Sequence, residues 1–246
     1  MARVTTSGQA AKEALLWLRW ADTDYRSARI LLLQGLLAPG AAFSNTAVEK
    51  YLKSLFSHRG RPVPHSHQVE KLYKLVKSET GSNLDVNESY LRLLEKAYKL
   101  RYPDEAKDGF NIALNQVRLL AELDRSVKKI IERFHIVRGD RGEKIMLILE
   151  RAVQERDTAI LANNVAIDPS LGLRLFSTPS HSYDFRRHKG QTYETGYVSA
   201  TVSDGPDHEL EGFSVISDTQ FNVAYPPLLQ SPNSASVNGL SQVRVP

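Results

Sequence analysis

The stretch of sequence that decides the fold is residues 110–134, FNIALNQVRLLAELDRSVKKIIERF. Its apolar residues recur every three or four positions over about seven turns, which places them on one face of a helix. They are Phe110, Leu114, Val117, Leu120, Ala121, Val127, Ile130, Ile131 and Phe134. The pattern predicts one long amphipathic helix, and its apolar face requires other helices to cover it.

Four segments before this stretch show the same spacing of apolar residues. They are residues 11–37, 43–58, 67–77 and 85–102. Proline and glycine interrupt the helical pattern at residues 38–40, APG, and in the loop of residues 59–64, RGRPVP. Asp85 and Glu88 have the spacing of a capping box that opens the fourth helix, and Pro103 ends or kinks it. The sequence therefore predicts an all-α fold, an antiparallel bundle of four to five helices.

The part of the chain after this bundle has a different composition. Residues 143–163 predict an extra helix. From Ser177 onward Ser, Thr, Pro, Gly and Asn dominate, and the strand-like segments are residues 193–202, 212–217 and 220–225, with Asp218-Thr219 as a candidate hairpin turn. We therefore expect a helical domain over residues 1–136, a helical extension over 137–175 and a mostly irregular or small β region over 176–246, whose tail, 231–246, is expected to be disordered.

The composition is that of a globular protein, with 41% hydrophobic and 24% charged residues. There is no cysteine, which excludes disulfide scaffolds, thiol nucleophiles and zinc sites built on thiolates. The N-terminus carries Glu13, Arg19 and Asp22 where a signal peptide would be apolar, and the apolar runs are too short for a membrane helix. We therefore expect a cytoplasmic protein without a membrane segment.

The charge is unevenly distributed along the chain. Residues 1–143 hold 24 Lys and Arg against 17 Asp and Glu, a net charge of +7, whereas residues 144–246 hold 8 against 11, a net charge of −3. A basic domain attracts partners that carry phosphate, such as RNA or nucleotides. The alternative is an ordinary solvated surface rich in lysine, because the excess is spread over many helical turns.

Three short segments carry the motifs of the helical region. The first is residues 43–56, FSNTAVEKYLKSLF, with a Glu-Lys pair and a second Lys three positions later. The second is residues 67–72, HQVEKL, whose histidine opens the third helix, and the third is residues 98–104, YKLRYPD. In this order and spacing they resemble the HEPN family, the higher eukaryote and prokaryote nucleotide-binding domain, over about residues 15–134.

The resemblance implies a helical domain that binds nucleotide or RNA, commonly forms a homodimer, and is often encoded beside a minimal nucleotidyltransferase as a toxin and antitoxin pair. Many members are metal-independent RNases with Arg, four to six residues, then His. Arg101 occupies the place of that arginine, but residues 106–108 are Ala, Lys and Asp, so the motif is incomplete. RNA cleavage needs a general acid and base with pKa values near neutrality, and lysine and aspartate are poor substitutes.

The motifs nominate five residues for binding nucleotide or RNA, and no catalytic residue, metal ligand or cofactor. They are Arg101, Tyr102, Asp104, Lys50 and Lys53. Arginine matches phosphate geometry and a tyrosine ring stacks on a base. The structural alternative is that Arg101 pairs with Asp104 or Glu105, and that Glu49 and Lys53 form a stabilising pair four residues apart.

Other residues have similar open interpretations. Trp17 and Trp20 lie three positions apart, so one of them can be core while the other is exposed at a dimer face.

The basic run of residues 186–189, RRHK, could touch phosphates but is more simply a solvated segment. His65 and His67 lack further ligands for a metal, and their spacing from Arg59 and Arg61 is interpreted as coincidence because all four belong to the loop after the second helix.

The sequence thus leaves three functions open. The first is a nucleotide- or RNA-binding module that lacks strong catalysis. The second is a divergent HEPN RNase in which other residues replace the missing histidine. The third is a protein-interaction partner of a minimal nucleotidyltransferase, with the C-terminal region as the arm that binds it.

Overall fold

A computed structural model of the chain describes residues 8–80, 84–138 and 143–199. Its helices are α1 (Gly8–Leu33), α2 (Leu37–His58), α3 (Val69–Thr80), α4 (Glu88–Tyr98), α5 (Gln116–Ile131), α6 (Ile148–Glu155), α7 (Thr158–Leu161) and α8 (Leu171–Phe176), with two 3-10 turns, η1 (Lys99–Arg101) and η2 (Pro103–Glu105). Its strands are β1 (Asn111–Asn115), β2 (Val137–Arg138), β3 (Glu143–Lys144), β4 (Ser180–His188) and β5 (Gln191–Ser199). The predicted helical bundle with an extra helical part and a small β part is therefore confirmed.

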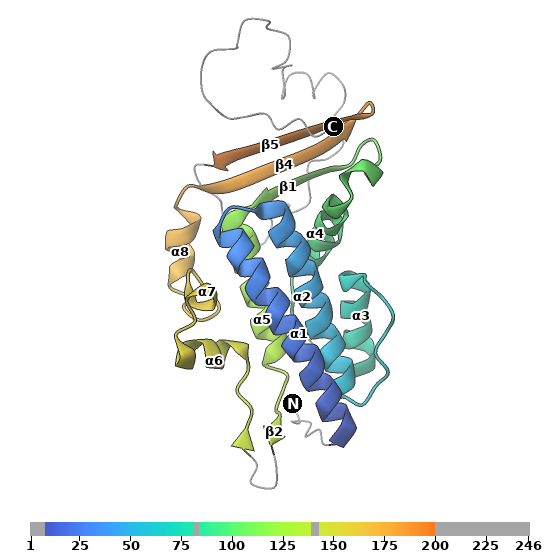
Figure 1. The fold of residues 1–246 in the computed structure, drawn as a ribbon, viewed down its shortest axis with the longest axis vertical. Coiled ribbons are helices and arrows are strands. Elements are labelled where there is room, and N and C mark those ends of the chain that lie inside the picture. The colour runs from blue at the N-terminus through green and yellow to red at the C-terminus, as the bar shows by residue number, and fades with distance from the viewer. Residues whose placement is uncertain (1–7, 81–83, 139–142, 200–246) are drawn as a thin grey trace, which may run out of the picture. The chain divides into compact units, whose positions relative to one another are not determined.

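Helices α1, α2 and α5 run lengthwise through the bundle, with α3 and α4 on one side and α6 to α8 on the other (Figure 1). The aromatic rings of Tyr25, Tyr51, Tyr90 and Phe56 are fully buried among Leu, Val and Ile side chains of this core. Burial of this much apolar surface is the main force that holds such helices together.

A tight connection sets the close packing of α1 against α2. Gly35 has a φ of +76°, and the N–H of Leu36 donates to the carbonyl of Leu31, which ends α1 in a left-handed turn. A Cβ atom at Gly40 would lie 2.6 Å from Cδ2 of Leu32, so the helices approach where no side chain separates them. The predicted break at residues 38–40 is wrong, because Pro39 lies in the first turn of α2, where its missing N–H is tolerated.

The predicted helix of residues 110–134 begins later than expected. Residues 111–115 form strand β1, and α5 starts at Gln116 with Asn115 as its N-cap, whose side chain accepts from the N–H of Arg118 at 3.1 Å. The start of α4 is also different. Asn87, and not Asp85, caps it by accepting from the N–H of Ser89 at 3.0 Å.

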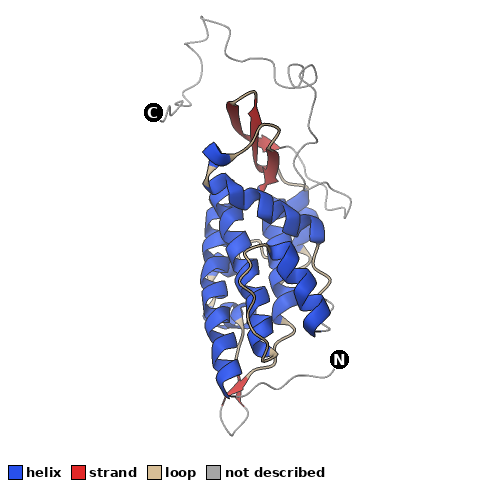
Figure 2. Cartoon of the chain, turned by 90° about the vertical axis from the view of Figure 1, so that its right-hand side faces the viewer, coloured by secondary structure: helices blue, strands red, loops and turns tan. Residues whose placement is uncertain are grey.

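Three strands form an antiparallel sheet in the order β1-β4-β5 across one end of the helical bundle (Figure 2), and β2 pairs separately with β3. Ile112 of β1 lies opposite Phe185 of β4, and both are completely buried against the helices. Lys189 and Gly190 join β4 to β5 with φ values of +50° and +74°, as in a type I′ hairpin turn. The basic run 186–189, predicted as a solvated segment, is thus the end of a strand.

The segment after the bundle is held to it by a buried polar network. Arg29 is fully buried and forms an ion pair with Asp124, and its guanidinium also donates to the carbonyls of Ala159 and Ala162. The Asn164 side chain donates to the hydroxyl of Tyr25 at 3.0 Å. The predicted helix of residues 143–163 is interrupted, since α6 and α7 are separate helices, and the carbonyls at the end of α7 accept from Arg29.

Some expectations concern residues that the structure does not describe. The strand-like segments of residues 212–217 and 220–225, and the tail of residues 231–246, lie outside the described residues. Among the helices in the described part of the chain, none combines the length and the hydrophobicity of a membrane span.

Candidate nucleic-acid interface

The Arg-Tyr-Pro-Asp motif forms two consecutive 3-10 turns after α4. Pro103 has no N–H to extend the preceding helix, and it opens η2 as its first residue. Tyr102, which links η1 to η2, has a φ of −133°, outside the helical range. The chain therefore turns sharply, and the side chains from residues 101 to 105 are all exposed.

Arg101 is held by two tyrosine rings. Its Cζ atom lies 4.9 Å from the ring centroid of Tyr98 and 5.7 Å from that of Tyr102, and Nη1 donates to the hydroxyl of Tyr98 at 2.5 Å. These cation-π contacts position a guanidinium that remains exposed. The Tyr102 side chain is 51% exposed, so one aromatic surface is available beside the cation.

The expected alternative pairing of Arg101 does not form. Within the described residues, no ion pair joins Arg101 to Asp104 or Glu105, and Asp104 makes no hydrogen bond with another described side chain. The partners of Arg101 are the two aromatic rings. The guanidinium thus keeps N–H donors that a phosphate can accept.

Lys50 and Lys53 lie on α2 and take part in interactions with α1. Lys53 is 5% exposed, bonds to Glu49 at 2.7 Å and lies 5.4 Å from the ring centroid of Trp17. Lys50 bonds to Asp24 at 2.6 Å. Among the interactions of the described residues, none joins these lysines to Arg101, and their contacts fit the stabilising alternative.

His67, the histidine of the second motif, belongs to this helix contact. Its Nδ1 lies 3.1 Å from the Glu49 carboxylate, which also accepts from Lys53. The neighbouring Tyr51 hydroxyl donates to Asp22 at 2.7 Å, and burial raises the pKa of Tyr51 well above its usual value. The spacing of charges along α2 therefore produces a polar seam beside its contact with α1.

The hairpin of β4 and β5 lies next to the turn that follows Arg101. The N–H of Gly109 donates to the carbonyl of Arg187, whose own N–H donates to the carbonyl of Phe110. The Asp108 carboxylate accepts from the N–H of Gly190 at 2.9 Å, so the hairpin turn is fastened to the loop. Two basic segments that are about 80 residues apart in sequence thus meet at one end of the sheet, which the sequence did not indicate.

A family model, the HEPN domain, matches residues 14–137 of this sequence. The chain belongs to the HEPN domain family. All three motif segments lie within the matched residues. No curated protein and no solved structure matches the chain.

The incomplete RNase motif of this HEPN domain is visible in the structure. Residues 106–108, where the histidine of the motif would stand, form the exposed turn before β1, and Asp108 is bonded to the hairpin. His188 belongs to the strand segment beside Gly109, but strand alternation directs its side chain to the face opposite that of Arg187. Nothing therefore places an imidazole beside Arg101 in the described part of this HEPN protein.

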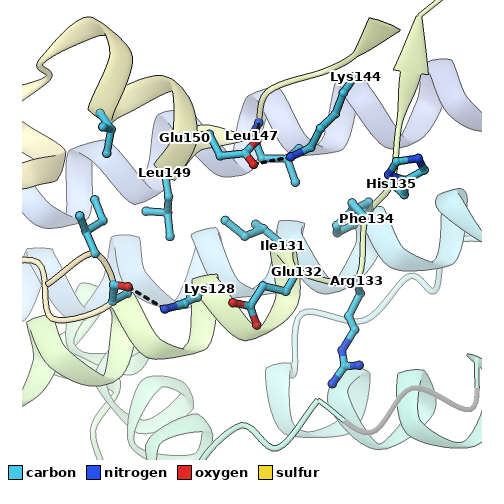
Figure 3. A pocket seen from close by; sticks show the side chains of 13 residues that line it. Lys128, Ile131, Glu132, Arg133, Phe134, His135, Lys144, Leu147, Leu149 and Glu150 are labelled. Carbon is cyan, nitrogen blue, oxygen red and sulfur yellow. Dashed lines mark hydrogen bonds and ion pairs between the residues drawn. The ribbon is translucent and has the colours of Figure 1, made fainter. Parts of the chain in front are cut away.

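A pocket of about 480 Å³ lies at the other end of α5 (Figure 3). Ile131, Leu147 and Leu149 surround it, and charged residues form its rim. Its lysines are already engaged, since Lys128 donates to the carbonyl of Ala166 at 2.9 Å and Lys144 pairs with Glu150. This site offers less to a phosphate than the exposed guanidinium of Arg101.

Proposed function

We propose that this HEPN protein binds RNA or nucleotides through the surface of Arg101 and Tyr102, without strong catalysis. The observation that carries the proposal is the exposed guanidinium held between Tyr98 and Tyr102. An arginine fixed in this way loses little conformational entropy when it binds a phosphate. The absence of histidine at residues 106–108 speaks against cleavage by the mechanism of the family's RNases.

Arg101 and Tyr102 would contact different parts of the ligand. Arg101 offers N–H donors to a phosphate, and exposed Tyr102 offers a ring on which a base stacks. Asp104 stays in the proposal as an acceptor for a base or a ribose hydroxyl beside them. Lys50 and Lys53 contribute to the stability of α2 instead, because their ammonium groups already have partners.

We also propose that the protein acts as a homodimer. The exposed side of α1 carries Leu16, Trp20 and Ile30, each more than 40% exposed. They occupy one face of the helix, opposite the buried residues Ala14, Leu18 and Tyr25. An apolar stripe of this kind is typical of a surface that another protein covers.

The test is binding of a fluorescent RNA pool to the purified protein by anisotropy. Arg101→Ala is expected to weaken binding, and Tyr102→Ala to weaken it roughly 5- to 150-fold, the range of a lost base stack of about 1 to 3 kcal/mol. Raising the salt severalfold should weaken binding of the unaltered protein. Arg92→Ala is the control, since Arg92 is an exposed arginine on α4 away from the two tyrosines.

The same samples are followed for cleavage over a range of pH. RNA that stays intact agrees with the proposal, whereas cleavage that depends on Arg101 would replace it with a divergent RNase. If binding of RNA is unchanged by Arg101→Ala and by salt, the proposed binding surface is wrong. A protein-interaction role would then be the better hypothesis.

A further inference from the structure

We infer that the ligand of this surface is single-stranded RNA, and that the tip of the β4–β5 hairpin supplies the second half of the binding site. The inference rests on the proposed function, because the first half is the Arg101 surface. What is new is the part played by Arg187 and Lys189, which lie outside the residues that match the family model.

The loop after α4 and the hairpin tip are both rich in basic residues. Residues 96–110 and 187–190 together hold six Lys and Arg against three Asp and Glu, a net charge of +3, whereas the neighbouring Arg186 is buried and pairs with Asp184. The whole chain of 246 residues has a net charge of +4. The place where the two segments meet is therefore basic, and it attracts a polyanion.

The direction of the Arg187 side chain follows from its place in β4. Arg187 has the same strand parity as Phe185, whose ring packs on the helical bundle and lies 5.7 Å from the ring of Phe110. Strand alternation therefore directs Arg187 to the helical side of the sheet, where the loop after α4 lies. Its Nη1 donates to Thr192 at 2.6 Å, which positions the guanidinium without neutralising it.

The hairpin is rigidly held against the loop that follows the 3-10 turns. Three hydrogen bonds join residues 108–110 to the hairpin, and they are the carboxylate bond of Asp108 with Gly190 and the two backbone bonds between Arg187 and residues 109 and 110. Figure 1 shows the hairpin tip directly beside the green segment that contains the 3-10 turns. The hairpin tip, which carries Arg187, is thus fixed to the loop that follows Arg101 and Tyr102, so that one nucleic-acid strand could contact both.

The exposed ring of Tyr102 indicates the class of nucleic acid. Tyr102 presents one exposed ring, and a base can stack on it only when it is not paired within a helix. Phosphates on either side of such a base can then reach Arg101 and the hairpin. A mononucleotide is too short for both halves, so it contacts the Arg101 half alone.

The test uses the full chain and a fluorescent 12-nucleotide RNA without self-pairing. The variant Arg187→Gln with Lys189→Asn removes two charges, and asparagine suits the positive φ of residue 189, so the turn is retained. Binding should weaken roughly tenfold, and the slope of log affinity against log salt should fall by about 1.4, or 0.7 for each lost phosphate contact. Lys12→Ala with Arg174→Ala, two exposed cations of α1 and α8, is the matched control and should change neither value.

Two further comparisons separate this inference from the proposed function. The hairpin variant should bind a mononucleotide as the unaltered protein does, and a blunt RNA duplex should bind at least tenfold more weakly than the single strand. If Arg101→Ala weakens binding but the hairpin variant does not, the inference about the hairpin is wrong and the proposed function stands. Equal affinity for duplex overturns the assignment to single strands, and no RNA binding at all overturns both.

Discussion

At the scale of single residues, His58 shows how burial changes a titratable group. It is the last residue of α2, is 1% exposed and has its ring 5.0 Å from that of Phe134. Burial, and then the charge of Arg59, lowers the pKa of His58 from 6.5 to about 4. The imidazole is thus neutral in the folded protein at pH values where the unfolded chain carries a charged histidine.

This difference predicts a loss of stability in acid. Because the unfolded state binds the proton more tightly, the free energy of unfolding should fall as the pH is lowered from about 6.5 to about 4, by roughly 3 kcal/mol in total. Urea unfolding at several pH values measures it. The variant His58→Gln cannot take up this proton. The difference in the free energy of unfolding between the two proteins should therefore shrink as the pH is lowered across that range. An equal pH dependence of both proteins would show that the pKa of His58 is the same in the folded and the unfolded chain and would contradict the prediction.

At the scale of elements, the amphipathic helices could be predicted but the place where helix gives way to strand could not. Ile112 and Leu114 are buried in β1, and the position of Leu114 also fits the apolar spacing that continues into α5. The choice depends on pairing with β4, some 70 residues later in the chain. Pairing between strands so far apart in the sequence does not change the local spacing of apolar residues, so that spacing could not predict it.

Strand β4 did leave a signal that could have been used. Ser182, Asp184 and Arg186 alternate with Tyr183 and Phe185, which is the period of two expected for a strand. The high polar content of residues 180–188 hid it. The candidate site could likewise be predicted only in part. The sequence motif indicated Arg101 and Tyr102, whereas the neighbouring hairpin became apparent only through tertiary contacts.

The buried ion pair of Arg29 and Asp124 joins α1 to α5 and holds the guanidinium that donates to the carbonyls of Ala159 and Ala162. In Asp124→Asn the guanidinium of Arg29 stays buried without a counter-charge, and loss of one partner of such a pair costs about 3 to 5 kcal/mol. Urea unfolding measures this, and hydrogen exchange should show residues 158–164 losing protection. Arg29→Met with Asp124→Leu removes both charges and should be less damaging. A loss under about 1 kcal/mol in Asp124→Asn would contradict this role of the pair.

At the scale of the whole molecule, the described surface separates into two regions with different chemistry. The end of the sheet beside Arg101 carries the exposed cations Arg101 and Lys189, and the outer face of α1 carries the exposed apolar residues Leu16, Trp20 and Ile30. The residues from Leu16 to Ile30 extend over about 21 Å of this helix. A separate apolar face allows a second copy to bind without covering the basic surface.

This arrangement predicts that the oligomeric state and RNA binding can be changed independently. Light scattering should give twice the chain mass of 27.6 kDa, and Trp20→Glu should give the single mass, because it places a charge in the centre of the apolar stripe. Val153→Glu is the control, since Val153 is 54% exposed but lies on α6, away from the stripe. A monomeric unaltered protein, or a dimer that survives Trp20→Glu, would contradict the prediction. If instead Trp20→Glu gives a monomer that no longer binds RNA, then the binding surface is completed by the second copy.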